Sequence, residues 1–242
     1  MPLRERFAST AFMPLAASLA FAACVAFAVG FPAELHRTCR EDGPIESFTA
    51  VAFLASAIAF AAAATRRDDS ALGRAHRLWL WAAAVGAFLC FGEEISWGQR
   101  LLGIETPRPF LELNAQRELN VHNLQGVQPL KYTVLVAGIS LALIGAFAVR
   151  TLAPARALAR TLKVPVPALA DLSWLVASIF LLRNLANCLA MAERNDAQEL
   201  GELFLALGVC AFAVRARLVP ASIVVAAETL MPAADSCRST VR

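Results

Sequence analysis

Two long stretches without a charged side chain constrain this chain more than any other feature. Neither 7–33 nor 47–65 contains an Asp, Glu, Lys or Arg. A helix of about 20 apolar residues crosses the roughly 30 Å hydrocarbon core of a bilayer, so each stretch predicts a membrane span. The composition agrees, because 58% of the residues are hydrophobic and only 17% are charged. These values exclude a soluble globular domain, a disordered chain and a collagen-like or coiled-coil protein.

The remaining apolar runs, read with the charges and turn residues between them, predict an all-α fold, a polytopic membrane helix bundle. We expect six transmembrane helices and a long structured outer loop between the third and the fourth. They lie near 11–32, 46–65, 78–98, 130–149, 168–190 and 199–215. A single transmembrane domain would cover 1–217, followed by a cytoplasmic tail at 218–242. Arg4 and Arg6 before the first run also fit a cleaved signal peptide, which would leave five spans in the same orientation.

The basic residues predict the orientation of the bundle. With both termini in the cytoplasm, fourteen of the 22 Lys and Arg residues are cytoplasmic and seven lie outside, with Arg183 inside a span. The positive-inside rule favours this arrangement. Thirteen of the 19 acidic residues then lie outside or at outer helix ends, and this bias predicts a polar site there. Membrane lipids are the expected partners, a protein partner in the membrane is a further possibility, and nucleic-acid binding has no support.

The third predicted span ends in the segment GEEISWGQR, at 92–100, with two adjacent carboxylates about a turn inside its outer end. Carboxylates in a span are costly unless they face protein or water, so Glu93 and Glu94 are candidate catalytic residues. Adjacent helical side chains point about 100° apart, so one of the two would face a ligand and the other a structural partner. The alternative is a pair of carboxylates that meet water at the membrane interface. Trp97, Gln99 and Arg100 are candidate substrate-binding residues, although Trp97 also fits an ordinary interfacial anchor.

The loop after this span carries polar residues at alternate positions from 114 to 123. Whether the segment is extended or helical, Glu118 and His122 share one face, so both are candidate catalytic residues. We expect His122 within about 8 Å of Glu93 or Glu94, a reach that a bridging ion or water allows. The candidate substrate-binding residues of this loop are the amides Asn114, Gln116, Asn120 and Asn123.

A third set of polar residues comes from the last two predicted spans and from the start of the second. Arg183, with Asn184 and Asn187 beside it, is a candidate substrate-binding residue. A guanidinium inside an apolar span needs a carboxylate, so we expect Arg183 to pair with Glu93, Glu94, Glu199 or Glu202, either as a substrate clamp or as a structural ion pair. Acid-rich sites suit Ca²⁺, Mg²⁺ or Mn²⁺ rather than zinc. The candidate metal ligands are Glu46, Glu93, Glu94, His122, Glu199 and Glu202.

The segment GEEISWGQR, followed by the pattern N-x-Q-x-E-x-N-x-H-N at 114–123, resembles a family of bacterial multi-pass membrane proteins. The resemblance covers 92–123 and implies a bacterial inner membrane protein without implying a substrate. Glu41, Asp42 and Glu46 give a fainter likeness to the ceramidase-like membrane hydrolases. Those enzymes bind zinc through several histidines, including an H-x-x-x-H pair that this chain lacks, so no catalytic residue is carried over from them.

These features favour two functions equally and a third less. One is a membrane enzyme, a hydrolase or group transferase acting on a lipid or lipid-linked substrate at the outer face with a divalent cation. The other is a non-catalytic subunit or scaffold of a membrane complex. A transporter fits less well, because the ionisable residues gather at one end of the spans instead of following a path through them. Polar residues that converge on one enclosed site would favour the enzyme, and a flat exposed polar surface would favour the subunit.

Overall fold

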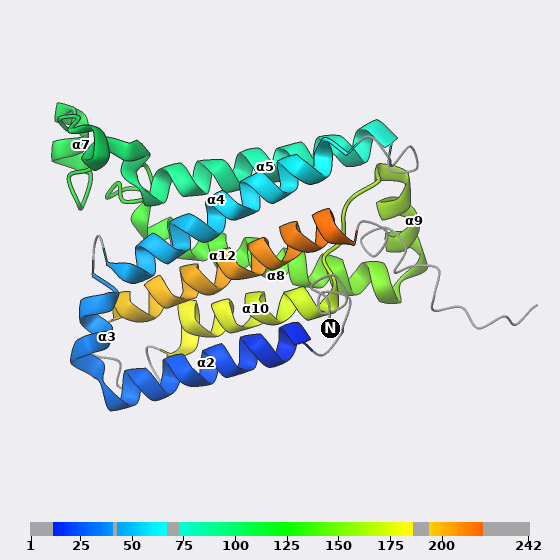
Figure 1. Ribbon diagram of the computed structural model, residues 1–242, viewed down its shortest axis with the longest axis horizontal. Helices are drawn as coiled ribbons and strands as arrows, with labels where there is room; N and C mark the ends of the chain where they lie inside the picture. The colour runs from blue at the N-terminus through cyan, green and yellow to red at the C-terminus, as the bar shows by residue number, and fades with distance from the viewer. Residues whose placement is uncertain (1–11, 41–42, 67–72, 186–193, 220–242) are drawn as a thin grey trace, which may run out of the picture.

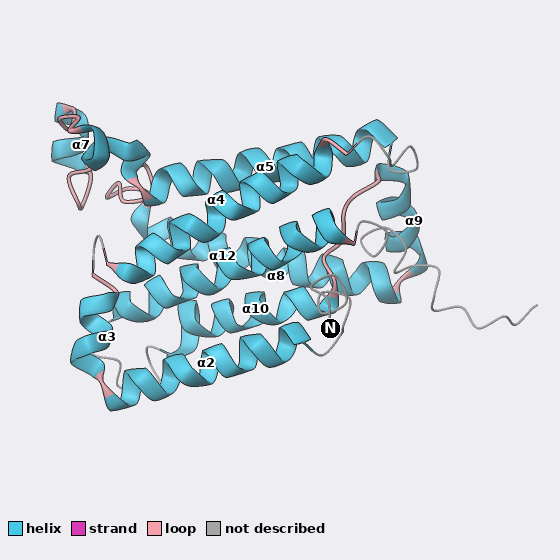
Figure 2. Ribbon diagram, viewed as in Figure 1, coloured by secondary structure: helices cyan, strands magenta, loops and turns pink. Residues whose placement is uncertain are grey.

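The chain forms an all-α membrane protein, as the sequence predicts. The computed structural model describes residues 12–40, 43–66, 73–185 and 194–219. Within these ranges the regular structure is helical, and only Asn114 and Leu124 form an isolated β-bridge (Figures 1 and 2). The helices are α2 (Phe12–Gly30), α3 (Pro32–Thr38), α4 (Pro44–Ala64), α5 (Gly73–Glu94), η2 (Ser96–Gly98), α6 (Gln99–Leu102), α7 (Arg108–Leu113), α8 (Gln128–Thr151), α9 (Ala153–Leu162), α10 (Leu169–Phe180), η3 (Leu181–Leu185) and α12 (Arg194–Leu218).

Five helices of the described part are long and apolar enough to cross a membrane: α2, α4, α5, α8 and α12. They match five of the six predicted spans. The sixth, predicted at 168–190, begins as α10 and changes at Leu181 to a π-helical turn that ends at Leu185. The rest of that predicted span falls in 186–193, outside the described ranges. The first 11 residues and the predicted tail beyond 219 also fall outside them.

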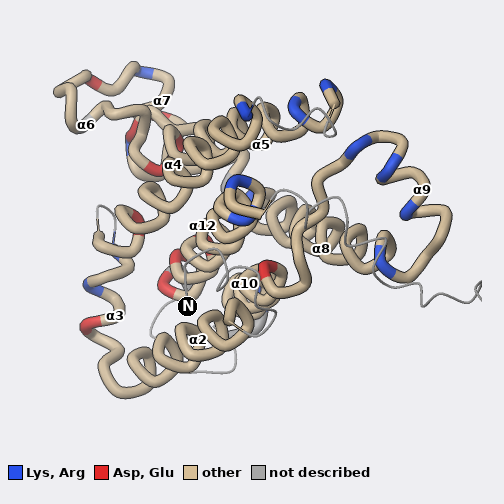
Figure 3. Tube along the Cα trace, turned by 45° about the vertical axis from the view of Figure 1, so that its right-hand side comes forward, with Lys and Arg blue, Asp and Glu red and all other residues tan. Residues whose placement is uncertain are grey.

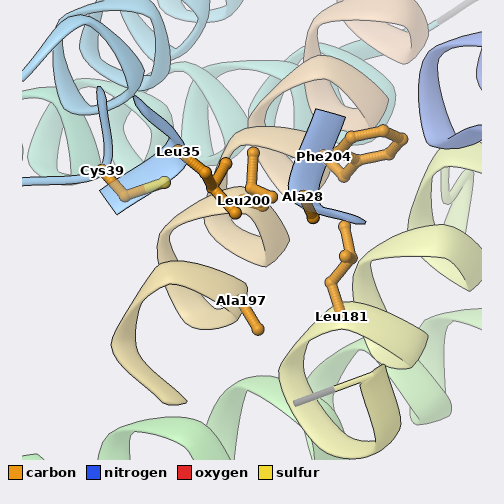
Figure 4. Packing of buried hydrophobic residues seen from close by; sticks show 7 residues of the cluster. All are labelled: Ala28, Leu35, Cys39, Leu181, Ala197, Leu200 and Phe204. Carbon is orange, nitrogen blue, oxygen red and sulfur yellow. The ribbon is translucent and has the colours of Figure 1, made fainter. Parts of the chain in front are cut away.

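The helices pack side by side in a bundle, with α4 between α5 and α12, and α10 between α12 and α2 (Figure 1). Small residues let these helices approach closely, as is common in membranes. Ala63 and Ala64 of α4 pack with Ala84 of α5 and Ala213 of α12, around the ring of Phe60. A second cluster joins α2, α3, η3 and α12 (Figure 4), and its buried members are Ala28, Leu35, Cys39, Leu181, Ala197, Leu200 and Phe204.

The two ends of the bundle differ in charge. Acidic residues lie near the starts of α4 and α12, at the end that carries α7 (Figure 3). Basic residues mark α9, the start of α5 and the end of α12, at the opposite end (Figure 3). We call these the loop end and the α9 end. Between α8 and α10, residues 153–162 form the helix α9.

A buried ion pair at the α9 end joins α10 to α12. Arg215 Nε donates to Asp171 Oδ2 at 2.8 Å, and Arg215 Nη2 donates to Asp171 Oδ1 at 3.0 Å. Their side chains are only 4% and 1% exposed. Asp171 Oδ2 also accepts the backbone N–H of Ala168, 3.2 Å away, at the start of α10. No local pattern predicts this pair, because the two residues are 44 positions apart in the sequence.

Candidate functional site

The long loop at the loop end begins with a left-handed turn. Ser96, Trp97 and Gly98 all have positive φ, and only glycine adopts such angles without strain. Trp97 folds back onto α5, where its Nε1 donates to Glu93 Oε1 at 2.9 Å. The ring lies against Gly92, where a Cβ atom would come within 2.8 Å of it. The contacts of Trp97 with Glu93 and Gly92 therefore hold the turn by which the chain leaves α5.

Glu93 attaches the loop to α5. Its Oε2 accepts the backbone N–H groups of Val121 and His122 at 2.7 and 3.0 Å. His122 Nδ1 lies 3.3 Å from the same oxygen. The predicted proximity of His122 to Glu93 is confirmed, and the contact is direct. Two of the four contacts of this carboxylate are with backbone N–H groups of the loop, so Glu93 has a structural role as well.

His122 is held in one orientation by this contact. A carboxylate only accepts hydrogen bonds, so Nδ1 carries the proton that points to Glu93, and Nε2 is the basic atom. Nε2 has no hydrogen-bond partner among the described residues. Burial lowers the pKa of His122, and the positive charge of Lys131 lowers it further, against the opposite effects of Glu202 and Glu93. The imidazole is therefore neutral at pH 7 and able to accept a proton.

The alternating residues of the loop bond mainly to each other. Asn114 donates through Nδ2 to the backbone oxygen and the Oδ1 of Asn120, both at 2.8 Å. Its Oδ1 accepts the N–H groups of Gln116 and Glu118 at 2.9 and 3.3 Å. Ser96 Oγ donates to Glu118 Oε2 at 2.5 Å and accepts from Asn120 Nδ2 at 2.9 Å. The segment thus forms turns, and neither the extended nor the helical conformation expected from the sequence is present.

The other amides assigned to substrate binding also bond within the loop. Gln99 Oε1 accepts the N–H of Leu119 at 2.6 Å, and Gln99 Nε2 donates to Thr106 Oγ1. Asn123 Nδ2 donates to Gln116 Oε1. These contacts stabilise the fold of the loop. The substrate-binding role of the same residues stays a prediction. The side chains of Arg100, Asn184 and Asn187 are outside the part of the chain that the structure describes.

A separate set of ionisable groups lies where α5, α8 and α12 meet, and we call it the ionisable cluster: Glu94, Lys131, Glu199 and Glu202. Lys131 Nζ lies 2.6 Å from Glu202 Oε1, with side-chain exposures of 12% and 7%. Glu94 and Glu199 interact electrostatically with both members of this pair, and with Glu46 at the start of α4. Carboxylates therefore outnumber the ammonium group in a sparsely hydrated part of the bundle.

Lys131 was missed because it was counted only among the outer charges, although the predicted span near 130–149 includes it. Lys131 lies within the first turns of α8, immediately before an apolar run, and this position was the signal that could have identified it as a charge inside a span. The predicted pairing of Arg183 is wrong. Arg183 is exposed in η3, and it forms no ion pair with Glu93, Glu94, Glu199 or Glu202, all of which are described. Lys131 takes the place that the sequence analysis gave to Arg183.

The candidate metal ligands do not come together as one set. Glu93 points to the loop backbone, while Glu202 contacts the ammonium group of Lys131. Within the described ranges, no three residues among His, Cys, Asp and Glu are arranged to hold a metal ion. The divalent cation stays a prediction without support from this geometry.

Comparison of the chain with protein-family models, curated proteins and solved structures finds no match in any of the three.

Proposed function

We propose that this protein is a membrane enzyme, a hydrolase or group transferase, that uses acid–base chemistry on a lipid or lipid-linked substrate at the loop end. The observation that carries the proposal is the contact between Glu93 and His122 beside the ionisable cluster. A carboxylate that fixes an imidazole, leaving its second nitrogen unpaired, is the arrangement that general-base catalysis uses. His122 interacts electrostatically with both Lys131 and Glu202, and this supports treating the two features as one site.

In this proposal His122 Nε2 takes the proton of the attacking group, which is water in a hydrolase and an acceptor hydroxyl in a transferase. Glu93 stabilises the imidazolium that forms, since it lies 3.3 Å from Nδ1. The ammonium group of Lys131 stabilises the negative charge that develops on a carbonyl or phosphoryl oxygen. As the bond to the leaving group breaks, that group receives a proton from the imidazolium. No step requires a metal ion. The carboxylates of Glu94, Glu199 and Glu202 set the electrostatic environment of Lys131.

The substrate class follows from the position of the site. Four helices that meet at the loop end, α4, α5, α8 and α12, are candidate membrane spans, so a headgroup at the bilayer surface lies level with the site. We place this end outside the cytoplasm of a bacterial cell, with both termini inside. The separation of charge between the loop end and the α9 end supports that orientation, and the resemblance of 92–123 supports the bacterial inner membrane.

The test compares lipid turnover by the wild-type protein and by matched variants in nanodiscs made from a bacterial lipid extract. Mass spectrometry before and after incubation should show a headgroup released or transferred by the wild type. His122→Gln should lower the rate by about a hundredfold or more, which is the usual contribution of a general base. His36→Gln is the control, because His36 lies at the same end and contacts Asp196 at 3.2 Å, a residue with no role in the proposed proton transfer. Equal turnover by the wild type and H122Q would contradict the proposal.

A second candidate, a non-catalytic subunit of a membrane complex, is favoured by the bonding within the loop and by its apolar turn. The amides of the loop bond to loop groups, and Leu101 and Leu102 of α6 are 83% and 71% exposed. A protein partner would cover such a turn. Leu102→Asn should then release a defined partner while the fold is kept, whereas the enzyme proposal expects turnover by the isolated protein.

A further inference from the structure

Helix α9, between α8 and α10, has two chemically distinct faces. At 100° per residue, Pro154, Leu158 and Leu162 fall within about 40° of one direction. Arg156 and Arg160 fall on the opposite side. Such a helix, with a basic polar face and leucines opposite, is typical of segments that lie in the plane of a membrane surface.

The apolar face of α9 is not covered by the rest of the described protein. No residue of α9 is buried, and Leu158 and Leu162 are 59% and 46% exposed. Arg156, in contrast, turns to the bundle, where its Nη2 donates to the backbone oxygen of Arg150 at 2.8 Å. The apolar face therefore points away from the groups that fix the helix.

Helix α9 is fixed beside a candidate membrane span. Trp79 Nε1 of α5 donates to the backbone oxygen of Leu162, and His76 Nδ1 donates to that of Lys163, both at 3.0 Å. The α9 C-terminus closes with Lys163 at φ 54, where the N–H groups of Lys163 and Val164 bond to the backbone oxygens of Arg160 and Ala159.

These contacts set the depth of α9. Trp79 lies six residues after Gly73, the first residue of α5, which is about 9 Å along the helix axis. The end of α9 is therefore level with the first turns of a span, where tryptophan commonly marks the membrane interface. Figure 1 shows α9 running across the long axis of the bundle at this end. A helix at this depth and in this direction lies parallel to the bilayer surface.

The charges at this end suit anionic headgroups. Arg74 and Arg77 of α5, Lys163 after α9, and Arg217 of α12 are all exposed. Each Lys or Arg at an anionic bilayer surface contributes about 1 kcal/mol, a fivefold change in affinity. Depth, direction and charge thus favour a lipid surface over a protein partner as the occupant of the apolar face.

We propose that α9 is an in-plane anchor that binds an anionic lipid surface, with Leu158 and Leu162 among the acyl chains and the surrounding cations at the phosphates. The anchor links α8 to α10 and is pinned to α5. Anionic lipid therefore binds at the end of the bundle opposite the ionisable cluster. This inference does not depend on the proposed enzymatic activity.

The first test uses spin labels at single positions of the full-length protein, with its native cysteines replaced and helix content checked by circular dichroism. In nanodiscs that contain phosphatidylglycerol, a label at Leu158 should be relaxed by oxygen and shielded from a water-soluble nickel chelate. A label at Arg160, on the opposite face, should show the reverse. Nickel access at Leu158, or shielding of Leu158 from both reagents as in a protein contact, would overturn the proposal.

The second test measures lipid selectivity with the native cysteines in place. Native mass spectrometry should show phosphatidylglycerol retained over phosphatidylcholine by the wild type. Lys163→Gln should lower that preference about fivefold. Arg37→Gln, which removes an exposed charge in α3 at the loop end, should leave it unchanged. An equal loss in both variants, or no preference in the wild type, would refute the role of the cations.

Discussion

The buried pair of Asp171 and Arg215 gives the sharpest quantitative prediction for stability. Asp171→Asn keeps the size of the side chain and removes the charge that opposes the guanidinium. The side chains are 1% and 4% exposed, so water cannot replace the lost carboxylate without a rearrangement of α10 and α12. Removing one partner of a buried pair costs about 3–5 kcal/mol, because the guanidinium stays buried after it loses the carboxylate charge of Asp171. The folding equilibrium should therefore shift by roughly a hundredfold to several thousandfold.

The free energy of unfolding can be measured by titrating bicelle-embedded protein with a denaturing detergent and following helix content. Two controls separate the buried charge from other effects. Asp171→Leu combined with Arg215→Met removes both charges and should lie within about 1 kcal/mol of the wild type, because apolar residues often replace a buried pair at little cost. Arg37→Gln breaks an exposed pair with Glu34 and should cost less than about 1 kcal/mol. A loss below 1 kcal/mol in D171N would refute the reasoning.

Three further predictions concern the loop end. Gly92→Ala should destabilise the protein by about 1–3 kcal/mol, because its Cβ would meet the Trp97 ring at 2.8 Å. The control is Gly86→Ala, where no atom lies within 4 Å of the added Cβ, and it should be neutral or stabilising by up to about 1 kcal/mol. Equal changes of melting temperature in the two variants would contradict this prediction. Asn114→Ala removes four hydrogen bonds and should accelerate hydrogen exchange of the loop amides about tenfold or more, whereas unchanged exchange would assign the loop fold to other contacts. The pKa of His122 is lowered from 6.5 in the folded state, so the unfolded state binds a proton first. Stability should be full above pH 6.5 and fall on acidification by at most about 1.4 kcal/mol per pH unit, and His122→Gln should flatten that slope in unfolding titrations.

The sequence predicted part of the site because local patterns carry it. The proximity of Glu93 and His122 followed from a loop that leaves and re-enters the bundle at the same end. The role of Glu93 in holding the loop could not be predicted, because it rests in part on two backbone N–H groups, which any sequence supplies. The expected partner of Arg183 was wrong for a related reason. Depth in a span can be read from a sequence, but the direction in which a side chain points depends on neighbouring helices.

The sequence by itself determined that this chain is an all-α membrane protein, where most of its spans lie and which end carries the acids. These properties follow from hydrophobic length and from charge counts, which are sums over neighbouring residues. Only the tertiary structure decided which charges meet. The pairs of Lys131 with Glu202 and of Asp171 with Arg215 join residues 71 and 44 positions apart. No local pattern in a sequence encodes a contact between residues so far apart in the chain. The packing angles and rotations of the helices determine which side chains meet.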